Sequence, residues 1–204
     1  MKRVLIGLVG LATVACARDH RGDGVPAGVG PLVAVYKIAI DDGSGVARRA
    51  RLSLWAEAPD RLHAELIAPV GGVLFVLDAG GGNACVVDVA AATAYVGTGG
   101  PGAIEALVGV SLSVSDAVAA LLHGASPRGL AVTRGGGADG TLPETIRIVD
   151  GARSIALSRV RFERGRTDPR TLGTGTPPTQ LPVRPIESLA RETGLEPARP
   201  GGNR

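Results

Sequence analysis

The chain has 204 residues, 45% of them hydrophobic and 2% aromatic, and a formal net charge of +3 at pH 7. This length is enough for one domain with a sizeable core. The small charge argues against a nucleic-acid-binding protein, which needs a concentrated basic face. The scarcity of aromatic rings argues against stacking platforms for single-stranded nucleic acid or for sugars.

The N-terminus is typical of a bacterial lipoprotein signal peptide. Two basic residues precede an apolar run over residues 4–12, which is too short to span a bilayer stably. Small residues then lead to Cys16, as in a lipobox, although Thr13 stands where Leu is usual. We therefore predict that residues 1–15 are removed and that Cys16 carries lipid acyl chains such as palmitate. The alternative is an ordinary cleaved signal, which would leave Cys16 as a free thiol.

Residues 16–30 are polar and glycine-rich without any period, which is typical of a flexible tether. The folded domain is predicted to occupy residues 31–166. Its first half alternates apolar and polar residues in short runs separated by turn residues, which indicates antiparallel strands. These runs lie at residues 35–40, 50–56, 62–66, 73–77, 84–89 and 93–96.

Helical spacing replaces this alternation over residues 101–123. Gly109 and Gly124 are helix stop signals, and Ser113 begins a set of capping residues, so two inserted helices are predicted. Weaker strands follow at residues 129–134, 145–149 and 154–162. The last of them changes phase, which predicts a bulge near Ser158 and Arg159.

Residues 167–204 form a proline-rich C-terminal tail that holds seven of the 14 prolines. Proline favours an extended chain, which could lie over the domain surface. Residues 186–192 are predicted to form one or two helical turns, and the last ten residues are predicted to be disordered.

Together these elements predict a mainly β fold with an α lid. About eight strands would form a curved antiparallel sheet, an incomplete or half barrel covered by the inserted helices. Such a sheet encloses an aliphatic cavity suited to an acyl chain, or else the same side chains fill a solid core. The residues predicted to line the acyl-chain cavity are Leu52, Leu54, Leu62, Leu66, Leu74, Val76, Ile104, Leu107, Val118 and Leu121.

The order of the elements resembles the LolA/LolB lipoprotein-localisation family, which includes the outer-membrane lipoprotein receptor LolB, over residues 33–165. The resemblance begins with a hairpin followed by Ile67-Ala68-Pro69-Val70-Gly71 and an apolar strand. It continues with Val86-Val87-Asp88, a short strand at Tyr95, the segment 103–112 and a helix that closes at Leu121-Leu122-His123-Gly124.

The resemblance implies a non-enzymatic lipoprotein chaperone without a cofactor. It would be a monomer, lipid-anchored in the cell outer membrane and facing the periplasm. It would accept the acyl chains of lipoproteins or other lipids, with a periplasmic carrier protein as a possible partner, and deliver them to the outer membrane. Ala17 fits this location, because the inner-membrane retention signal has Asp after the cysteine.

The resemblance further implies that Pro69-Val70-Gly71 is a membrane-insertion loop. Val70 takes the place of an exposed Leu in the family, and as a smaller side chain it would insert more weakly. On the simpler interpretation, Val70 is an apolar turn residue tucked against the core.

The alternative function is an outer-membrane lipoprotein with a structural or assembly role, which binds a protein partner without carrying lipid. The contact would use the tail or the arginines at positions 147, 153, 159, 161, 164 and 166. Those arginines could instead form the wet face of edge strands or contact lipid headgroups.

No residue pattern typical of catalysis or of a metal site is found in the sequence. His20, His63 and His123 are scattered, and Cys85 lies in an apolar stretch where a buried, inert thiol is the default. His63 is expected on the polar face of a strand, and a hydrolase would need it in a polar cleft. No catalytic residue, metal or cofactor is therefore predicted.

Overall fold

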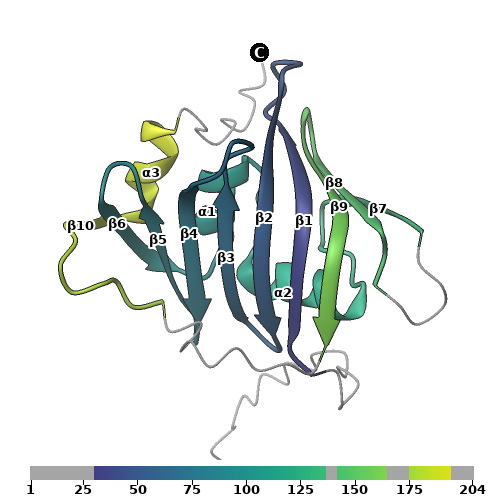
Figure 1. Ribbon diagram of the computed structural model, residues 1–204, viewed down its shortest axis with the longest axis horizontal. Helices are drawn as coiled ribbons and strands as arrows, with labels where there is room; N and C mark the ends of the chain where they lie inside the picture. The colour runs from purple at the N-terminus through teal and green to yellow at the C-terminus, as the bar shows by residue number, and fades with distance from the viewer. Residues whose placement is uncertain (1–29, 137–141, 165–174, 194–204) are drawn as a thin grey trace, which may run out of the picture.

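The computed structural model describes residues 30–136, 142–164 and 175–193. Within these residues ten strands form one sheet in the order β10-β6-β5-β4-β3-β2-β1-β9-β8-β7 (Figure 1). The strands are β1 (Leu32–Asp41), β2 (Ala47–Glu57), β3 (Arg61–Ile67), β4 (Val73–Gly80), β5 (Asn83–Asp88), β6 (Thr93–Thr98), β7 (Ala131–Gly135), β8 (Thr145–Asp150), β9 (Arg153–Arg164) and β10 (Val183–Pro185). The helices are α1 (Pro101–Val108), α2 (Val114–His123) and α3 (Ile186–Glu192).

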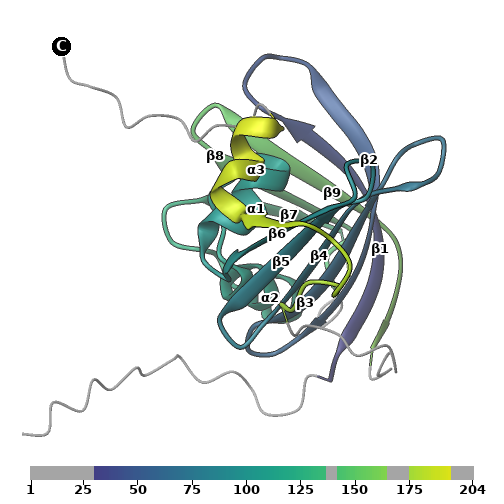
Figure 2. The same cartoon turned by 90° about the vertical axis from the view of Figure 1, so that its left-hand side faces the viewer.

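The predicted fold class is confirmed, because the protein is mainly β and its curved sheet is not closed into a barrel. Helices α1 and α2 cover one face of the sheet (Figure 2). The sheet is mixed rather than wholly antiparallel, since β10 pairs with β6 in parallel. The predicted signal peptide, Cys16 and the tether up to residue 29 lie outside the described residues.

Alternation along the strands decides which face is covered. In β1 the even-numbered residues from Leu32 to Ile40 are buried, while Lys37 on the other face is exposed. Register keeps this phase across the sheet, with Tyr36 opposite Leu52 and Leu52 opposite Leu66. We call the apolar face under α1 and α2 the inner face and the opposite one the outer face.

Four tight connections lie at the same end of the sheet, which we call the hairpin edge. They are residues 42–46, 68–72, 89–92 and 151–152, at the top of Figure 1. Register fixes this arrangement, because Asp41 at the end of β1 pairs with Ser154 at the start of β9. The β4–β5 turn lies at the opposite end, where Gly81 and Gly82 adopt the positive φ angles of 59° and 79° that such a turn requires.

The two inserted helices begin and end at the residues that the sequence predicts. The Ser113 hydroxyl accepts a hydrogen bond of 3.1 Å from the Asp116 amide and caps α2. Gly109 and Gly124 adopt left-handed conformations at the two C-termini. None of the helices in the described ranges is long and apolar enough to cross a membrane.

Strand β9 contains a bulge. Tyr36 pairs with Arg159 and Val35 pairs with Arg161, so Val160 is the extra residue. The predicted bulge near Ser158 and Arg159 is therefore confirmed, directly after Arg159. The bulge returns Phe162 to the inner face, opposite Ala34.

The described part of the C-terminal tail is built into the domain. β10 extends the sheet beyond β6, and α3 packs against α1 with Leu189 fully buried. The Tyr95 hydroxyl donates a 2.7 Å hydrogen bond to the Glu192 carboxylate, and the Thr193 hydroxyl donates one of 3.1 Å to the Ala106 carbonyl. Residues 186–192 form the predicted helix. The last ten residues, which are predicted to be disordered, lie outside the described part of the chain.

Gly97→Ala is expected to destabilise the fold. A Cβ atom at Gly97 would fall 3.0 Å from Ile186 Cβ and closer still to its Cγ2, so α3 must shift. We expect a loss of about 1–3 kcal/mol in the free energy of unfolding, measured by urea denaturation. Gly102→Ala in α1 is the control, because a Cβ there meets nothing within 4 Å. Equal stability of the two variants would contradict the described docking of α3.

Candidate functional site

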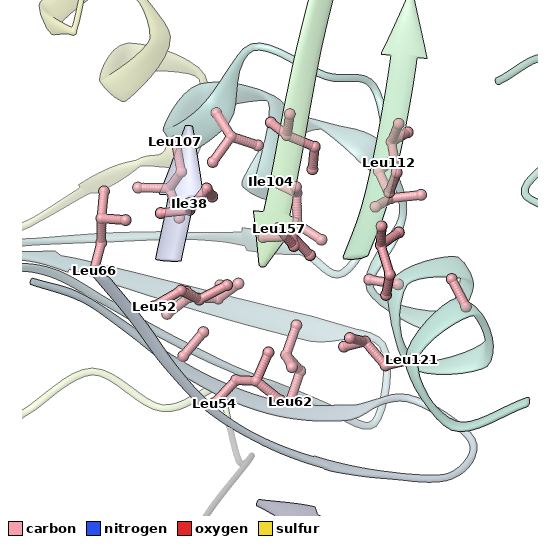
Figure 3. A pocket seen from close by; sticks show the side chains of 18 of the residues that line it. Ile38, Leu52, Leu54, Leu62, Leu66, Ile104, Leu107, Leu112, Leu121 and Leu157 are labelled. Carbon is pink, nitrogen blue, oxygen red and sulfur yellow. The ribbon is translucent and has the colours of Figure 1, made fainter. Parts of the chain in front are cut away.

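An apolar cavity of about 110 Å³ lies between the inner face of the sheet and helices α1 and α2 (Figure 3). Every residue that lines it is apolar. They are Ile38, Leu52, Leu54, Leu62, Ala64, Leu66, Phe75, Leu77, Ile104, Leu107, Val108, Leu112, Ala117, Ala120, Leu121, Ile146, Ile148, Ile155 and Leu157. The site can therefore hold hydrocarbon, but its walls offer no side chain for acid–base or nucleophilic chemistry.

Seven of the ten residues predicted for the cavity line it. They are Leu52, Leu54, Leu62, Leu66, Ile104, Leu107 and Leu121. In Figure 3, Leu52, Leu54 and Leu62 of the strands point toward the space that Leu107 of α1 and Leu121 of α2 border from the side of the helices. The strands β2 and β3 supply four of the seven, because their clear alternation fixes the phase of every residue on them.

The prediction is wrong for Leu74, Val76 and Val118. Register pairs Leu66 with Phe75 and Ala64 with Leu77, so Phe75 and Leu77 are the residues of β4 that line the cavity. Leu74 is instead 38% exposed. The run over residues 73–77 is apolar throughout, so it contains no alternation from which its phase could be predicted. Val118 is buried in the core, and α2 presents Ala117, Ala120 and Leu121 to the cavity instead.

The far wall of the cavity was missed at the sequence level. It is formed by Ile146 and Ile148 of β8 and by Ile155 and Leu157 of β9. Alternation in these two strands would have identified them, but nothing local shows that β9 pairs with β1 and so reaches the same inner face.

The cavity is most accessible toward the hairpin edge. Leu52, Leu66 and Phe75 are neighbours in register on that side and are only partly buried, as is Leu107 of α1. Further from the edge the leucines are almost completely buried: Leu54 and Leu77 in the next row are 4% and 3% exposed, and Leu62 in the row beyond it is 4% exposed. We call the group Leu52, Leu66, Phe75 and Leu107 the cavity mouth.

The cavity is smaller than an acyl chain requires. Its volume of about 110 Å³ is below the ~150 Å³ of an engineered apolar cavity that admits benzene. Only a short stretch of hydrocarbon would fit, so a whole chain requires the lid to move.

Polar contacts hold α1 in place. Arg153 donates a 3.2 Å hydrogen bond to the Gly109 carbonyl, and its guanidinium lies 3.9 Å from the Glu105 carboxylate. The Ser111 amide donates to Asp150 at 2.9 Å just beyond the helix. The side chains that α2 presents to the cavity are small or aliphatic, and such contacts are not directional. Polar contacts also hold the two ends of α2, since the Val114 amide donates a 3.0 Å hydrogen bond to the Gly99 carbonyl and Arg134 donates one of 2.6 Å to the Ala125 carbonyl.

The membrane-insertion loop predicted from the resemblance is the β3–β4 connection at the hairpin edge. Its backbone is closed by hydrogen bonds from Gly71 to the Ala68 carbonyl at 3.0 Å and from Ala68 to the Gly72 carbonyl at 2.9 Å. Val70 is 98% exposed, so the interpretation that it is tucked against the core is wrong.

A polar cluster lies on the outer face, across the sheet from the cavity. His63 pairs in register with Asp78, which pairs with Cys85. The His63 ring nitrogens lie 3.5 Å from Asp78 and 3.5 Å from Glu65. The hydrogen bond to Asp78 is the main cause that raises the pKa of His63, and the Glu65 carboxylate raises it further. His63 is thus partly buried between two carboxylates rather than freely solvated.

Cys85 is poorly suited to act as a nucleophile in this cluster. The thiol is 1% exposed, and burial together with the nearby Asp78 charge raises its pKa to about 11. Because the thiolate is the reactive form, Cys85 stays a protonated, inert thiol near neutral pH. Among the described residues, no group of three or more His, Cys, Asp or Glu side chains could hold a metal ion.

No protein-family model matches the sequence, and no curated protein matches it either.

Ala120→Leu is expected to fill the cavity at little cost in stability. The added carbon atoms enter open space, so the free energy of unfolding should change by less than about 1 kcal/mol. Ala103→Leu is the matched control in the other lid helix, because Ala103 is fully buried outside the cavity. Overpacking there should cost about 1–3 kcal/mol. Equal losses for both variants in urea denaturation would show that no cavity exists beside Ala120.

The stability of the protein is expected to fall as the pH rises above about 6.5. A histidine whose pKa is raised on folding stabilises the fold fully below its unfolded-state pKa, and this contribution is lost as the pH rises through the folded-state pKa. His63→Gln should flatten the slope of unfolding free energy against pH in this range. Asp78→Asn should also reduce this slope, because it removes the main cause of the raised His63 pKa. A slope in His63→Gln equal to that of the unaltered protein would contradict the assignment.

Proposed function

We propose that this protein is a lipid-anchored, non-enzymatic receptor that takes the acyl chains of lipoproteins or other lipids into its cavity and delivers them to the outer membrane. The observation that carries the proposal is a wholly apolar cavity, lined by the sheet and two lid helices, whose mouth faces the hairpin edge. An acyl chain is the ligand that such a lining suits, because it needs apolar contact and no hydrogen-bond partner.

The N-terminal sequence supports the location. The lipobox-like pattern ending at Cys16 would tether the domain to a membrane surface, and Ala17 fits the outer membrane, with the domain in the periplasm. Several acyl chains on one residue hold a protein where a single chain would not. The resemblance to the LolA/LolB family also supports lipoprotein acyl chains as the cargo and a periplasmic carrier protein as the partner that supplies them.

The proposed cycle uses two features of the hairpin edge. A cargo chain enters at the cavity mouth, between Leu66 and Leu107, and the lid helices move aside to admit it. Val70 meets the membrane at the same edge. Burying this side chain in lipid contributes only about 1–2 kcal/mol, so it assists release of the cargo but does not anchor the protein.

The alternative is a lipoprotein that binds a protein partner, through the tail for example, without carrying lipid. Deleting the tail would not test it cleanly. Because Leu189 is part of the core, deleting residues 167–204 would damage the domain itself. The decisive experiment therefore concerns the cavity.

Native mass spectrometry of residues 17–204, which include every described residue, is expected to show a stoichiometric complex with a synthetic diacylated lipopeptide. Ala120→Leu should weaken this complex at least tenfold, because it occupies the space of the acyl chain while the fold persists. Gly102→Ala, outside the cavity, should bind as the unaltered chain does. Failure of the unaltered chain to bind both the lipopeptide and a fluorescent fatty acid would refute the proposed function and favour a protein partner.

A further inference from the structure

Cationic side chains gather on the outer face of the sheet near the hairpin edge. β1 contributes Lys37, β2 contributes Arg49 and Arg51, and β8 contributes Arg147, and all four are exposed. Three of them belong to the β1–β2 hairpin, and pairing of β9 with both β1 and β8 brings Arg147 to the same surface. We call these four residues the cationic patch.

Register places the cationic patch on two adjacent rows. Lys37 lies directly opposite Arg51. The neighbouring row, closer to the hairpin edge, runs from β8 to β2 as Arg147, Ala156, Ala39 and Arg49. Adjacent strands are about 4.8 Å apart, so the two alanines form a low floor flanked by long cationic side chains. An anionic group could reach several of these cations at once.

The charge of the cationic patch is not neutralised by the sheet around it. Within the described residues, Lys37, Arg49 and Arg51 form no ion pair, whereas the neighbouring Arg48 binds Asp42 at 2.7 Å. The closest carboxylates by register are Asp41, diagonal to Arg49, and Glu65, diagonal to Arg51. The Asp41 Oδ1 atom accepts a hydrogen bond from the Gly43 amide, and Glu65 lies 3.5 Å from His63. Like charges directly opposite each other destabilise a sheet, so the pairing of Lys37 with Arg51 has a cost that folding alone does not explain.

Exposed apolar side chains lie next to the cationic patch. Of the six large hydrophobic residues that are exposed in the described part of the chain, four occupy or adjoin the connections of the hairpin edge: Val46, Val70, Leu74 and Val89. Val46, which is 68% exposed, belongs to the same β1–β2 hairpin as three of the four cations. Apolar tips beside a basic surface are typical of proteins that bind at a membrane interface.

We propose that the cationic patch and the hairpin edge together dock on an anionic bilayer. The cations bind the phosphate groups of lipid headgroups, and the apolar tips enter the interface beside them. This docking rests on the proposed function for its purpose, since it would hold the cavity mouth against the membrane that receives the cargo. An acidic protein surface would match the charge but would leave the exposed valines without a role.

Sedimentation with vesicles tests the proposal. Residues 17–204 are expected to bind vesicles of equal parts phosphatidylcholine and phosphatidylglycerol, to bind phosphatidylcholine vesicles far more weakly, and to lose binding as salt is added. The double variant Lys37→Gln, Arg51→Gln should bind the anionic vesicles roughly 25-fold more weakly, because each cation near such a surface contributes about fivefold. The matched control is Arg61→Gln, Arg164→Gln, which removes the same charge at the opposite end of the sheet.

Three outcomes would overturn the proposal. They are equal losses in the two double variants, equal binding to neutral and anionic vesicles, and retention on polyglutamate without binding to anionic vesicles, which would assign the patch to an acidic protein. Binding of the diacylated lipopeptide in solution distinguishes a failure of the proposed docking from a failure of the proposed function. Lys37→Gln, Arg51→Gln should bind the lipopeptide normally, and Ala120→Leu should bind the vesicles normally.

Discussion

The inner face of the sheet is a continuous aliphatic surface that must be kept from water, and the helices that cover it do not fill the space beneath them. α2 faces the sheet with Ala117 and Ala120, and these small side chains leave a gap above the leucines of β2 and β3. Chains that need only stability fill such gaps, because tight packing of the interior is favourable. The cavity exists because α1 and α2 are long enough to cover the inner face, while the alanine side chains of α2 are too small to fill the space beneath.

The two ends of the sheet differ in exposure and in side-chain chemistry, and one topology produces both. The end that carries the β4–β5 turn is closed by nearly complete burial of Leu54, Leu62 and Leu77. The hairpin edge instead combines the cavity mouth, exposed apolar tips and unneutralised cations. A meander brings alternate connections to one end, so a few substitutions in separate hairpins are enough to give that end its own chemistry.

Local patterns predict much of this structure, and long-range pairing accounts for most of what they miss. The helix boundaries at Ser113 and Gly124 follow from capping chemistry, and β2 and β3 follow from alternation. The phase of β4 could not be predicted, because both of its faces are apolar and only pairing with β3 decides between them. The late arginines do not share one surface: Arg147 is exposed on the outer face, Arg153 holds α1, and Arg159 lies over the Phe162 ring. Their separation depends on the bulge at Val160 and on register with β1.

The pairing of β1 with β9 also constrains the order in which the sheet can be completed. Strands β2 to β6 pair with neighbours in sequence, but Tyr36 pairs with Arg159, across most of the domain. During synthesis the N-terminus leaves the ribosome first, so β1 is available from the start. One edge of β1 nevertheless has no partner until β9 has been made. Contacts between residues so distant in sequence form slowly, because a long loop must close first. The strand at the centre of the finished sheet is therefore an open edge for most of the time that the chain takes to emerge.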